Sequence, residues 1–548
     1  MVHKFLISIF VPFLFLFHLT PPVLATTYYV SPNGSGTVCT NSDPCSLSYF
    51  QSDDYTGTKH INLAPGDVLY LKSGTYTRQA TLNFSSSGTA AARITISSAP
   101  GEPTKAVISG DVNGNGAVDE TDGPRTLDAA LYHQWTPLIQ ITGSYITFKD
   151  IEIAFSNGRG IQTEGSHNIL TGLNVHHTWG TAIHIFGSNT LIENNAVWRG
   201  VELNYCGGLG GRRMCNGNWP GGLAWGEAGG SAPPGKANHI TVRGNIVYNN
   251  SGEGILCMHT DYSIVENNVV YDNWGLGIYL DKCGYASIQN NLIYYTTDKN
   301  WWRTSDSSGN PIRPASGILI SNEDTGTSGD TYPLGHDRKI INNIIVGTGS
   351  GITFWSGNGS GGEYDYSRLI NDVIAYNTIV EAQNNGTGIS IDKPPLAGLS
   401  HTNTRIANNI ILQSNGTLAE VETAAGLTFD HNLWSRTPPT SLQGAGDVYA
   451  DPQLVDPNHT RVAGSVDADW YKLSASSPAI NTGVALPGIN TDYWNNPRDN
   501  PVDIGANESD FTTAPTSVST VPGDANSDGK VDWVDLVVWL INYLKNDQ

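Results

Sequence analysis

Short apolar segments with asparagine at their centre recur along the middle of the chain. In three places the next such asparagine follows after 23 residues: Asn245 to Asn268, Asn268 to Asn291, and Asn409 to Asn432. Valine and isoleucine on both sides of the asparagine favour short strands over helices. A fixed period in the low twenties predicts a solenoid with one coil per repeat. The copies lie at residues 192–197, 242–247, 265–270, 288–293, 340–345 and 406–411.

A second pattern, a glycine followed by apolar residues, recurs between these segments. We therefore expect three strands per coil, one after the glycine and two around the asparagine. Alternation places Ile278 and Leu280 inside the coil and Tyr279 outside. The asparagine would occupy a tight turn, where it tolerates positive φ, and its amide would bond to copies about 4.8 Å above and below. The glycines are Gly160, Gly254, Gly277, Gly317, Gly351 and Gly388.

The composition fits this all-β interpretation. The 548 residues include 61 glycines, and only 14% of residues are charged, which is typical of turn-rich β proteins. The net charge of -21 argues against nucleic acid as a partner, because phosphate binding needs a basic surface.

The first 25 residues predict export. Residues 1–25 have a lysine near the start, an apolar stretch and a small-residue cleavage site, as in a secretory signal peptide. A membrane anchor is the alternative, but the apolar run is short for a span. No later segment has the length and apolarity of a transmembrane helix, so we expect a secreted protein.

Six cysteines are in keeping with an exported chain. Local disulfides are expected for Cys39 with Cys45 and for Cys206 with Cys215. Cys257 and Cys283 fall on neighbouring coils but three positions out of register, which argues against a bond between them.

The chain divides into a signal peptide, an N-terminal cap (26–79), the coils (80–509), a Pro/Thr/Ser linker (510–523) and a terminal module (524–548). Long insertions interrupt the coils at residues 206–235 and 298–314. The start (28–34 and 65–67) and the end (477–483 and 503–506) resemble those of the right-handed parallel β-helix superfamily of pectate lyases and related polysaccharide lyases and glycosidases. That resemblance implies an all-β parallel solenoid and a polysaccharide or other glycan as partner.

The terminal module carries a predicted calcium loop. Oxygen ligands at positions 1, 3, 5, 9 and 12, a glycine at position 6 and a backbone carbonyl at position 7 suit a seven-coordinate Ca²⁺. The loop resembles a dockerin repeat, which implies a cohesin-type partner, although dockerins usually carry two repeats and this end of the chain has one. The ligands would be Asp524, Asn526, Asp528, Lys530, Asp532 and Asp535.

A second loop with the same spacing interrupts an early coil at residues 111–122. It predicts a structural calcium site more than a catalytic one, and the alternative is an Asp/Asn-rich turn without metal. Its ligands would be Asp111, Asn113, Asn115, Ala117 through its carbonyl, Asp119 and Asp122.

Tryptophans gather near the two long insertions, where a binding groove is expected because insertions border the ligand face of a solenoid. Their flat rings suit stacking on sugars, or they cover the edges of coils. Candidate substrate-binding residues are Trp179, Trp274, Trp301 and Trp302, together with His184 and Tyr279, which align on the outer face, and Arg303. Trp198, Trp219 and Trp225 belong to the same group.

The 23-residue register also selects candidate catalytic residues. Glu253 and Asp298 would lie about 10 Å apart, with Asp272 on the coil between them, which suits an acid and a base for hydrolysis. A β-elimination would instead use Lys282 as the base, Arg303 or Arg313 for a uronate carboxylate, and calcium held by Asp281 and Asp272. Polysaccharide cleavage by either route is the leading hypothesis. A non-catalytic glycan-binding β-helix or a scaffold subunit is the alternative.

Overall fold

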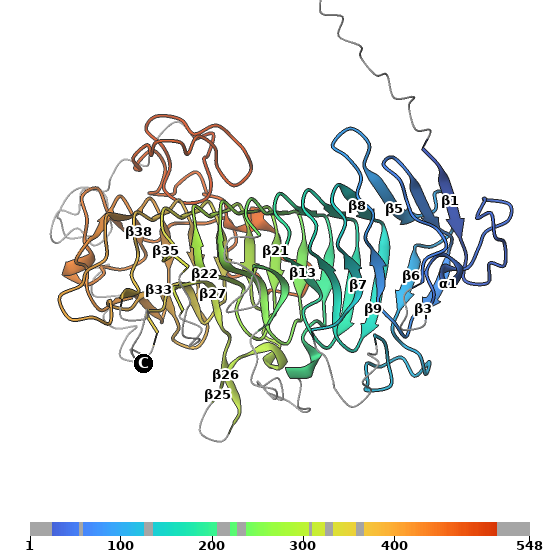
Figure 1. Cartoon of the computed structure of the whole chain (residues 1–548). Helices are drawn as coiled ribbons and strands as arrows, with labels where there is room; N and C mark the ends of the chain where they lie inside the picture. The colour runs from blue at the N-terminus through green and yellow to red at the C-terminus, as the bar shows by residue number, and fades with distance from the viewer. Residues whose placement is uncertain are drawn as a thin grey trace, which may run out of the picture.

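The computed structural model describes residues 25–53, 58–124, 135–204, 220–226, 237–305, 309–323, 332–357 and 366–511. Three long parallel sheets run side by side along one axis, and the chain winds around that axis from the N-terminal end to the C-terminal end (Figure 1). The predicted all-β parallel β-helix is therefore confirmed.

Sheet 1 has 13 strands, all paired in parallel with their neighbours. In order they are β1 (Thr27–Val30), β2 (Val68–Leu71), β5 (Ile94–Ser98), β8 (Ile146–Lys149), β11 (Ile169–Thr171), β14 (Leu191–Glu193), β17 (Thr241–Arg243), β20 (Ile264–Glu266), β23 (Ser287–Gln289), β28 (Lys339–Ile341), β31 (Val373–Ala375), β34 (Thr404–Ala407) and β37 (Leu427–Asp430).

Sheet 2 has 11 strands, and its outer face carries the candidate site. In chain order they are β4 (Leu82–Phe84), β7 (Pro137–Ile141), β10 (Arg159–Thr163), β13 (Ile183–Ile185), β16 (Gly221–Gly226), β19 (Glu253–Asp261), β22 (Ile278–Gly284), β27 (Ser316–Ser321), β30 (Ser350–Phe354), β33 (Thr387–Ile391) and β36 (Thr417–Val421).

Sheet 3 again has 13 strands. They are β3 (Gly74–Thr77), β6 (Ala106–Ser109), β9 (Ile151–Ser156), β12 (Asn174–Thr178), β15 (Ala196–Trp198), β18 (Ile246–Tyr248), β21 (Val269–Tyr271), β24 (Leu292–Tyr294), β29 (Ile344–Val346), β32 (Thr378–Val380), β35 (Ile410–Leu412), β38 (Leu433–Trp434) and β39 (Val448–Tyr449).

A few short elements lie outside the sheets. The helix α1 (Leu47–Phe50) buries Leu47 and Phe50 at the N-terminal end of the core. A β-hairpin of β25 (Thr304–Ser305) and β26 (Pro311–Arg313) projects from the stack (Figure 1). Within the described ranges the 3₁₀ helices are η1 (Glu202–Asn204), η2 (Lys299–Trp301), η4 (Thr440–Leu442) and η5 (Ala468–Tyr471). Beyond Tyr449 the described chain runs back over the outer side of sheet 3, where Tyr471 and Ile480 are buried.

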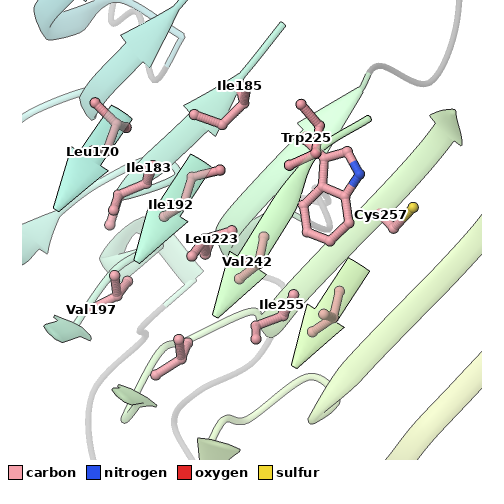
Figure 2. Packing of buried hydrophobic residues seen from close by; sticks show 14 of the residues in the cluster. Leu170, Ile183, Ile185, Ile192, Val197, Leu223, Trp225, Val242, Ile255 and Cys257 are labelled. Carbon is pink, nitrogen blue, oxygen red and sulfur yellow. The ribbon is translucent and has the colours of Figure 1, made fainter. Parts of the chain in front are cut away.

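Alternating residues of the strands fill the interior. Figure 2 shows Ile183, Leu223 and Ile255 of sheet 2 stacked along the axis, close to Ile192 and Val242 of sheet 1. Ile278 and Leu280 belong to the same core, whereas Tyr279 packs in a separate cluster on the outer face of sheet 2. Both directions agree with the predicted alternation.

The asparagine ladder runs through the turn between sheets 1 and 3. In each rung the amide nitrogen of one asparagine donates to the amide oxygen of the next at 2.9–3.0 Å, for example Asn245 to Asn268 and Asn268 to Asn291. The sequence predicts that one asparagine both adopts positive φ and makes the ladder bonds, but two neighbouring residues divide these roles. Asn267 takes the positive φ of 56°, while its neighbour Asn268 is buried and makes the ladder bonds. The stacked members are Asn195, Asn245, Asn268, Asn291, Asn343, Asn377, Asn409 and Asn432.

Two disulfides lie in the described chain. Cys39 and Cys45 are bonded as expected. Cys257 and Cys283 are bonded as well, so the prediction against this pair is wrong. His259, after Cys257 in β19, and Lys282, before Cys283 in β22, both have a φ of 48°, and Cys283 lies in the core beyond this bend. Register alone could not show that, because register assumes straight strands.

The disulfides indicate an extracytoplasmic location, because the cytoplasm keeps thiols reduced. Cys206 and Cys215 and residues 1–24 lie outside the described residues. No helix in the described ranges is long and apolar enough to cross a bilayer.

Candidate functional site

The candidate site is on the outer face of sheet 2, over β19, β22 and β27. Glu253 begins β19 beside Gly221 of β16, and Tyr279 of β22 lies between Leu256 and Leu319 in one outward column. Leu256, Leu276 and Tyr279 form an apolar cluster on this face with Tyr295. Charged groups on this face therefore lie against apolar side chains, where water stabilises their charge poorly.

Glu253 is an acid in an unfavourable place for its charge. Its side chain is 1% exposed, and burial raises the pKa of its carboxyl to about 8, with the nearby charge of Glu323 adding to the effect and Arg303 opposing it. Its Oε2 has no hydrogen-bond partner among the described residues. At neutral pH this carboxyl holds a proton and has an oxygen available for another molecule.

Glu323 lies two residues beyond the end of β27, and its charge acts on Glu253. Its carboxylate accepts a hydrogen bond from the hydroxyl of Tyr279, and its backbone N–H donates to Asp281 Oδ1 at 2.7 Å. Burial raises the pKa of Glu323 and of Tyr279. Asp281 in turn has its Oδ2 3.7 Å from Nε2 of His259. The site thus combines one neutral acid with a second carboxyl that is held in position from two sides.

Lys282 follows Asp281 at the bend of β22. Its side chain is fully buried and its φ is 48°. The disulfide from Cys283 to Cys257 joins β22 to β19 directly beside this bend.

Asp272 and Asp298 lie close together, and both bind Thr296. Asp272 accepts hydrogen bonds from the backbone N–H and the hydroxyl of Thr296, both at 2.8 Å. Burial, with Asp298 as a further cause, raises the pKa of Asp272 to about 6. Asp298 caps η2 by accepting from the N–H of Asn300 at 3.0 Å. The charges that act on Glu253 are those of Arg303 and Glu323.

The candidate tryptophans near the 298–314 insertion are buried. Trp274, Trp301 and Trp302 are 7%, 5% and 4% exposed, and Trp302 donates to the carbonyl of Thr296 at 3.2 Å. Arg303 lies 5.9 Å from the ring centroid of Trp274. These side chains pack the insertion onto the coils in the described conformation.

The other members of the tryptophan group are spread over different environments. Trp179 and Trp198 are half-buried, and Trp225 is completely buried in the core (Figure 2). Trp219 lies outside the described residues.

His184 is on the outer face, in the column that leads to Tyr279, as the alignment predicts. It is 4% exposed, donates from Nε2 to the carbonyl of Gly226 at 3.0 Å, and stacks on Phe186. Burial holds the pKa of the imidazole well below its usual value, so the ring is neutral at physiological pH.

The loop at residues 111–122 is folded around its own oxygen atoms. The carboxylate of Asp111 accepts from the backbone N–H groups of residues 114, 115 and 116 at 2.7–3.1 Å. The side-chain amides of Asn113 and Asn115 both donate to Asp119 Oδ2. Burial raises the pKa of Asp122, which is fully buried, to about 6.

These contacts fit a calcium ion in part. Three carboxylates and two amides of the loop lie in one short segment, as an oxygen-rich Ca²⁺ site requires. The carboxylates of Asp111 and Asp122 also bind loop N–H groups, so they are positioned by the backbone. Within the described ranges no three His, Cys, Asp or Glu side chains form a group that could hold a metal, and the loop would therefore depend on Asn113, Asn115 and the carbonyl of Ala117. The predicted ligands in module 524–548 lie outside the described residues.

Glu323 is a site residue that the sequence analysis did not select. The signal was present, because the glycine patterns at Gly277 and Gly317 set the register across the 298–314 insertion. That register pairs Asp281 with Ser321, two residues before Glu323. The 23-residue period does not hold across the insertion, so it could not predict the position of Glu323.

Residues 234–365, less than half of the chain, match the family model described as NosD, periplasmic copper-binding protein. No curated protein matches this chain.

Among solved structures the chain is similar to the pectate lyase Pel9A, with 17% identity, a TM-score of 0.47, and 88% of this chain and 96% of that chain covered. It is also similar to XylC in complex with xylose, with 12% identity, a TM-score of 0.49, and 89% and 98% covered. An alginate lyase from Paenibacillus sp. str. FPU-7 shows 16% identity, a TM-score of 0.40, and 73% and 99% covered.

Proposed function

We propose that this protein hydrolyses an extracellular polysaccharide at the outer face of sheet 2, with Glu253 as the general acid. The observation that carries the proposal is the burial of the Glu253 carboxyl, which is 1% exposed and whose Oε2 has no partner among the described residues. This burial raises the pKa of Glu253 to about 8 and so favours the neutral acid at physiological pH. A glycosidic oxygen needs a proton as its bond breaks, and a buried carboxylic acid supplies one.

Glu323 is the second carboxyl in this mechanism. It would activate water or attack the sugar, while the Tyr279 hydroxyl and the Asp281 contact to its backbone hold it in place. Repulsion between two negative charges disfavours ionisation of Glu253 and Glu323 at the same time. One carboxyl can then be the proton donor while the other is the base or nucleophile.

Hydrolysis suits these groups better than β-elimination. Elimination requires a base and a cation that neutralises a uronate carboxylate. The charges that act on Glu253 are those of Arg303 and Glu323, and Lys282, the candidate base, is fully buried at the bend. Arg303 donates to the carbonyl of Gly275 at 3.3 Å and lies against Trp274.

A non-catalytic glycan-binding function is the second candidate. The burial of Glu253 and Tyr279 favours it, because a polysaccharide reaches these side chains only if part of their cover moves. The two functions differ in turnover, so an activity assay separates them.

We also propose that the protein binds calcium at two loops and is secreted. Ca²⁺ bound at residues 111–122 would bring the carboxylates of Asp111, Asp119 and Asp122 around one ion and fix this early insertion. The dockerin-like module at 524–548 would bind a second ion and a cohesin-type partner. The leader-like residues 1–25 and the disulfides support a secreted protein.

The test is incubation of the full chain with xylan, arabinan, pectate and alginate, followed by measurement of new reducing ends and of ultraviolet absorbance from unsaturated products. Hydrolysis predicts reducing ends without the absorbance, and Glu253→Gln should abolish them while Glu420→Gln, an exposed carboxylate on the same face, should not. Unsaturated products would contradict hydrolysis. Full turnover by Glu253→Gln would contradict the role of Glu253.

A further inference from the structure

A second part of sheet 2, over β7, β10 and β13, carries an exposed aromatic and polar cluster that the proposed mechanism does not use. The guanidinium of Arg159 lies over two rings, 5.0 Å from the centroid of Trp135 and 5.3 Å from that of Phe186. Trp135 is 47% exposed although it packs on Arg159. These two cation–π contacts hold the guanidinium and the indole against each other.

The same arginine orients a line of polar side chains on neighbouring coils. Its Nη1 donates to the amide oxygen of Gln162, and the amide nitrogen of Gln162 donates to Glu164 Oε1 at 3.0 Å. Gln140, which pairs with Gln162 across the strands, donates to the same oxygen at 2.9 Å. Each amide is therefore held in one orientation by a charged neighbour.

This network leaves acceptor oxygens facing outward. Glu164 uses one carboxylate oxygen for the two amides, and neither its Oε2 nor the amide oxygen of Gln140 has a partner within the described part of the chain. Glu164 is exposed and Gln140 is half-exposed, on the outer face of the sheet, since Ile139 and Ile161 point into the core. Two fixed acceptors and an exposed indole, linked through Arg159 and Gln162, suit a molecule with hydroxyl donors and an apolar ring face.

We propose that Trp135, Gln140 and Glu164 form a binding site for uncharged sugar units of a polysaccharide. One sugar unit stacks on Trp135, and hydroxyls of units further along the same chain donate to Glu164 and Gln140. A uronate is rejected, because its carboxylate would meet the carboxylate of Glu164, and hydroxyl donors are what the two acceptors require. The site is independent of catalysis at Glu253.

The experiment is calorimetric titration of the full chain with cellohexaose, xylohexaose and a galacturonate hexamer, repeated in the Glu253→Gln background to prevent turnover. We expect an uncharged hexasaccharide to bind, with a loss of affinity of about tenfold or more in Trp135→Ala and of several-fold in Glu164→Ala, as removal of a stacking ring or a hydrogen-bonded acceptor predicts. Tyr449→Ala, which removes an exposed aromatic on sheet 3, should leave the affinity unchanged.

Two results would overturn this site: unchanged affinity in Trp135→Ala, or binding of the galacturonate hexamer as tight as that of the uncharged hexasaccharides. Absence of binding by either uncharged hexasaccharide would overturn it as well. Glu253→Gln should still bind the uncharged hexasaccharides. Binding that depends on Trp135 supports the site whether or not the wild type hydrolyses a polysaccharide.

Discussion

The strongest prediction concerns the stability of the protein when Glu253 is replaced by glutamine. In the folded chain the pKa of Glu253 is about 8, against a usual value of 4.5. A raised folded-state pKa means that the folded protein keeps a proton that the unfolded chain releases. The stabilisation present below pH 4.5 is therefore lost as pH rises towards 8.

The size of the effect follows from the pKa difference. Each unit corresponds to about 1.4 kcal/mol, so the wild type loses about 3 kcal/mol from this group between about pH 5 and about pH 8. Glutamine has nearly the same shape and no ionisable proton, and Glu253→Gln should escape this loss. The free energy of unfolding, from guanidinium titrations at several pH values, should show the variant gaining on the wild type as pH rises.

The matched control is Glu420→Gln, which changes an exposed carboxylate in an outward column of the same sheet. It should follow the wild type at every pH, because burial does not oppose its charge. A difference between Glu253→Gln and wild type that stays constant from about pH 5 to about pH 8 would refute the neutral buried acid.

Three further predictions test the fold and the calcium loop. Asn268→Leu should lower the free energy of unfolding by about 3 kcal/mol or more, because it leaves several buried ladder groups without partners, whereas Asn267→Gly, at an exposed position with positive φ, should change it little in the same guanidinium titration. Calcium should raise the thermal midpoint more at pH 7 than at pH 5, since protons compete for Asp122, whose pKa is about 6; an increase that is the same at both pH values would contradict binding there. The double change of Cys257 and Cys283 to alanine should cost about 3 kcal/mol of stability for a loop closed over 26 residues, and a loss of under 1 kcal/mol would contradict a bridging role.

The fold was predictable because its signal is repetition. Asparagines 23 residues apart identify neighbours one coil apart, and the observed ladder from Asn245 through Asn268 to Asn291 follows that spacing. The same register predicts Tyr279 and His184 in one outward column, and the strand pairing confirms it.

The site was less predictable, because side chains outside the strands have no period. Glu323 follows the end of a strand that comes after a long insertion, and its position depends on the length of that insertion. Asp298 falls in the insertion itself, where it caps η2, a contact that no register describes. Burial of Trp301 and Trp302 likewise results from how the insertion folds onto the coils.

A bend in β19 and β22 explains why the strand register did not predict the Cys257–Cys283 disulfide. The Cys257–Cys283 bond lies beside two residues of positive φ, His259 and Lys282. Neither residue type favours positive φ strongly enough for the bend to be predicted from the sequence. Tertiary packing of β19 on β22 fixes the bend, so it becomes visible only in the folded chain.

The pH dependence of polysaccharide hydrolysis tests the central claim most directly. With Glu253 as the proton donor, kcat/KM on an uncharged polysaccharide should fall as pH rises through about 8, where this carboxyl loses its proton, and Glu253→Gln should have no measurable turnover. Unchanged kcat/KM in Glu253→Gln, with the same alkaline fall as the wild type, would contradict the account.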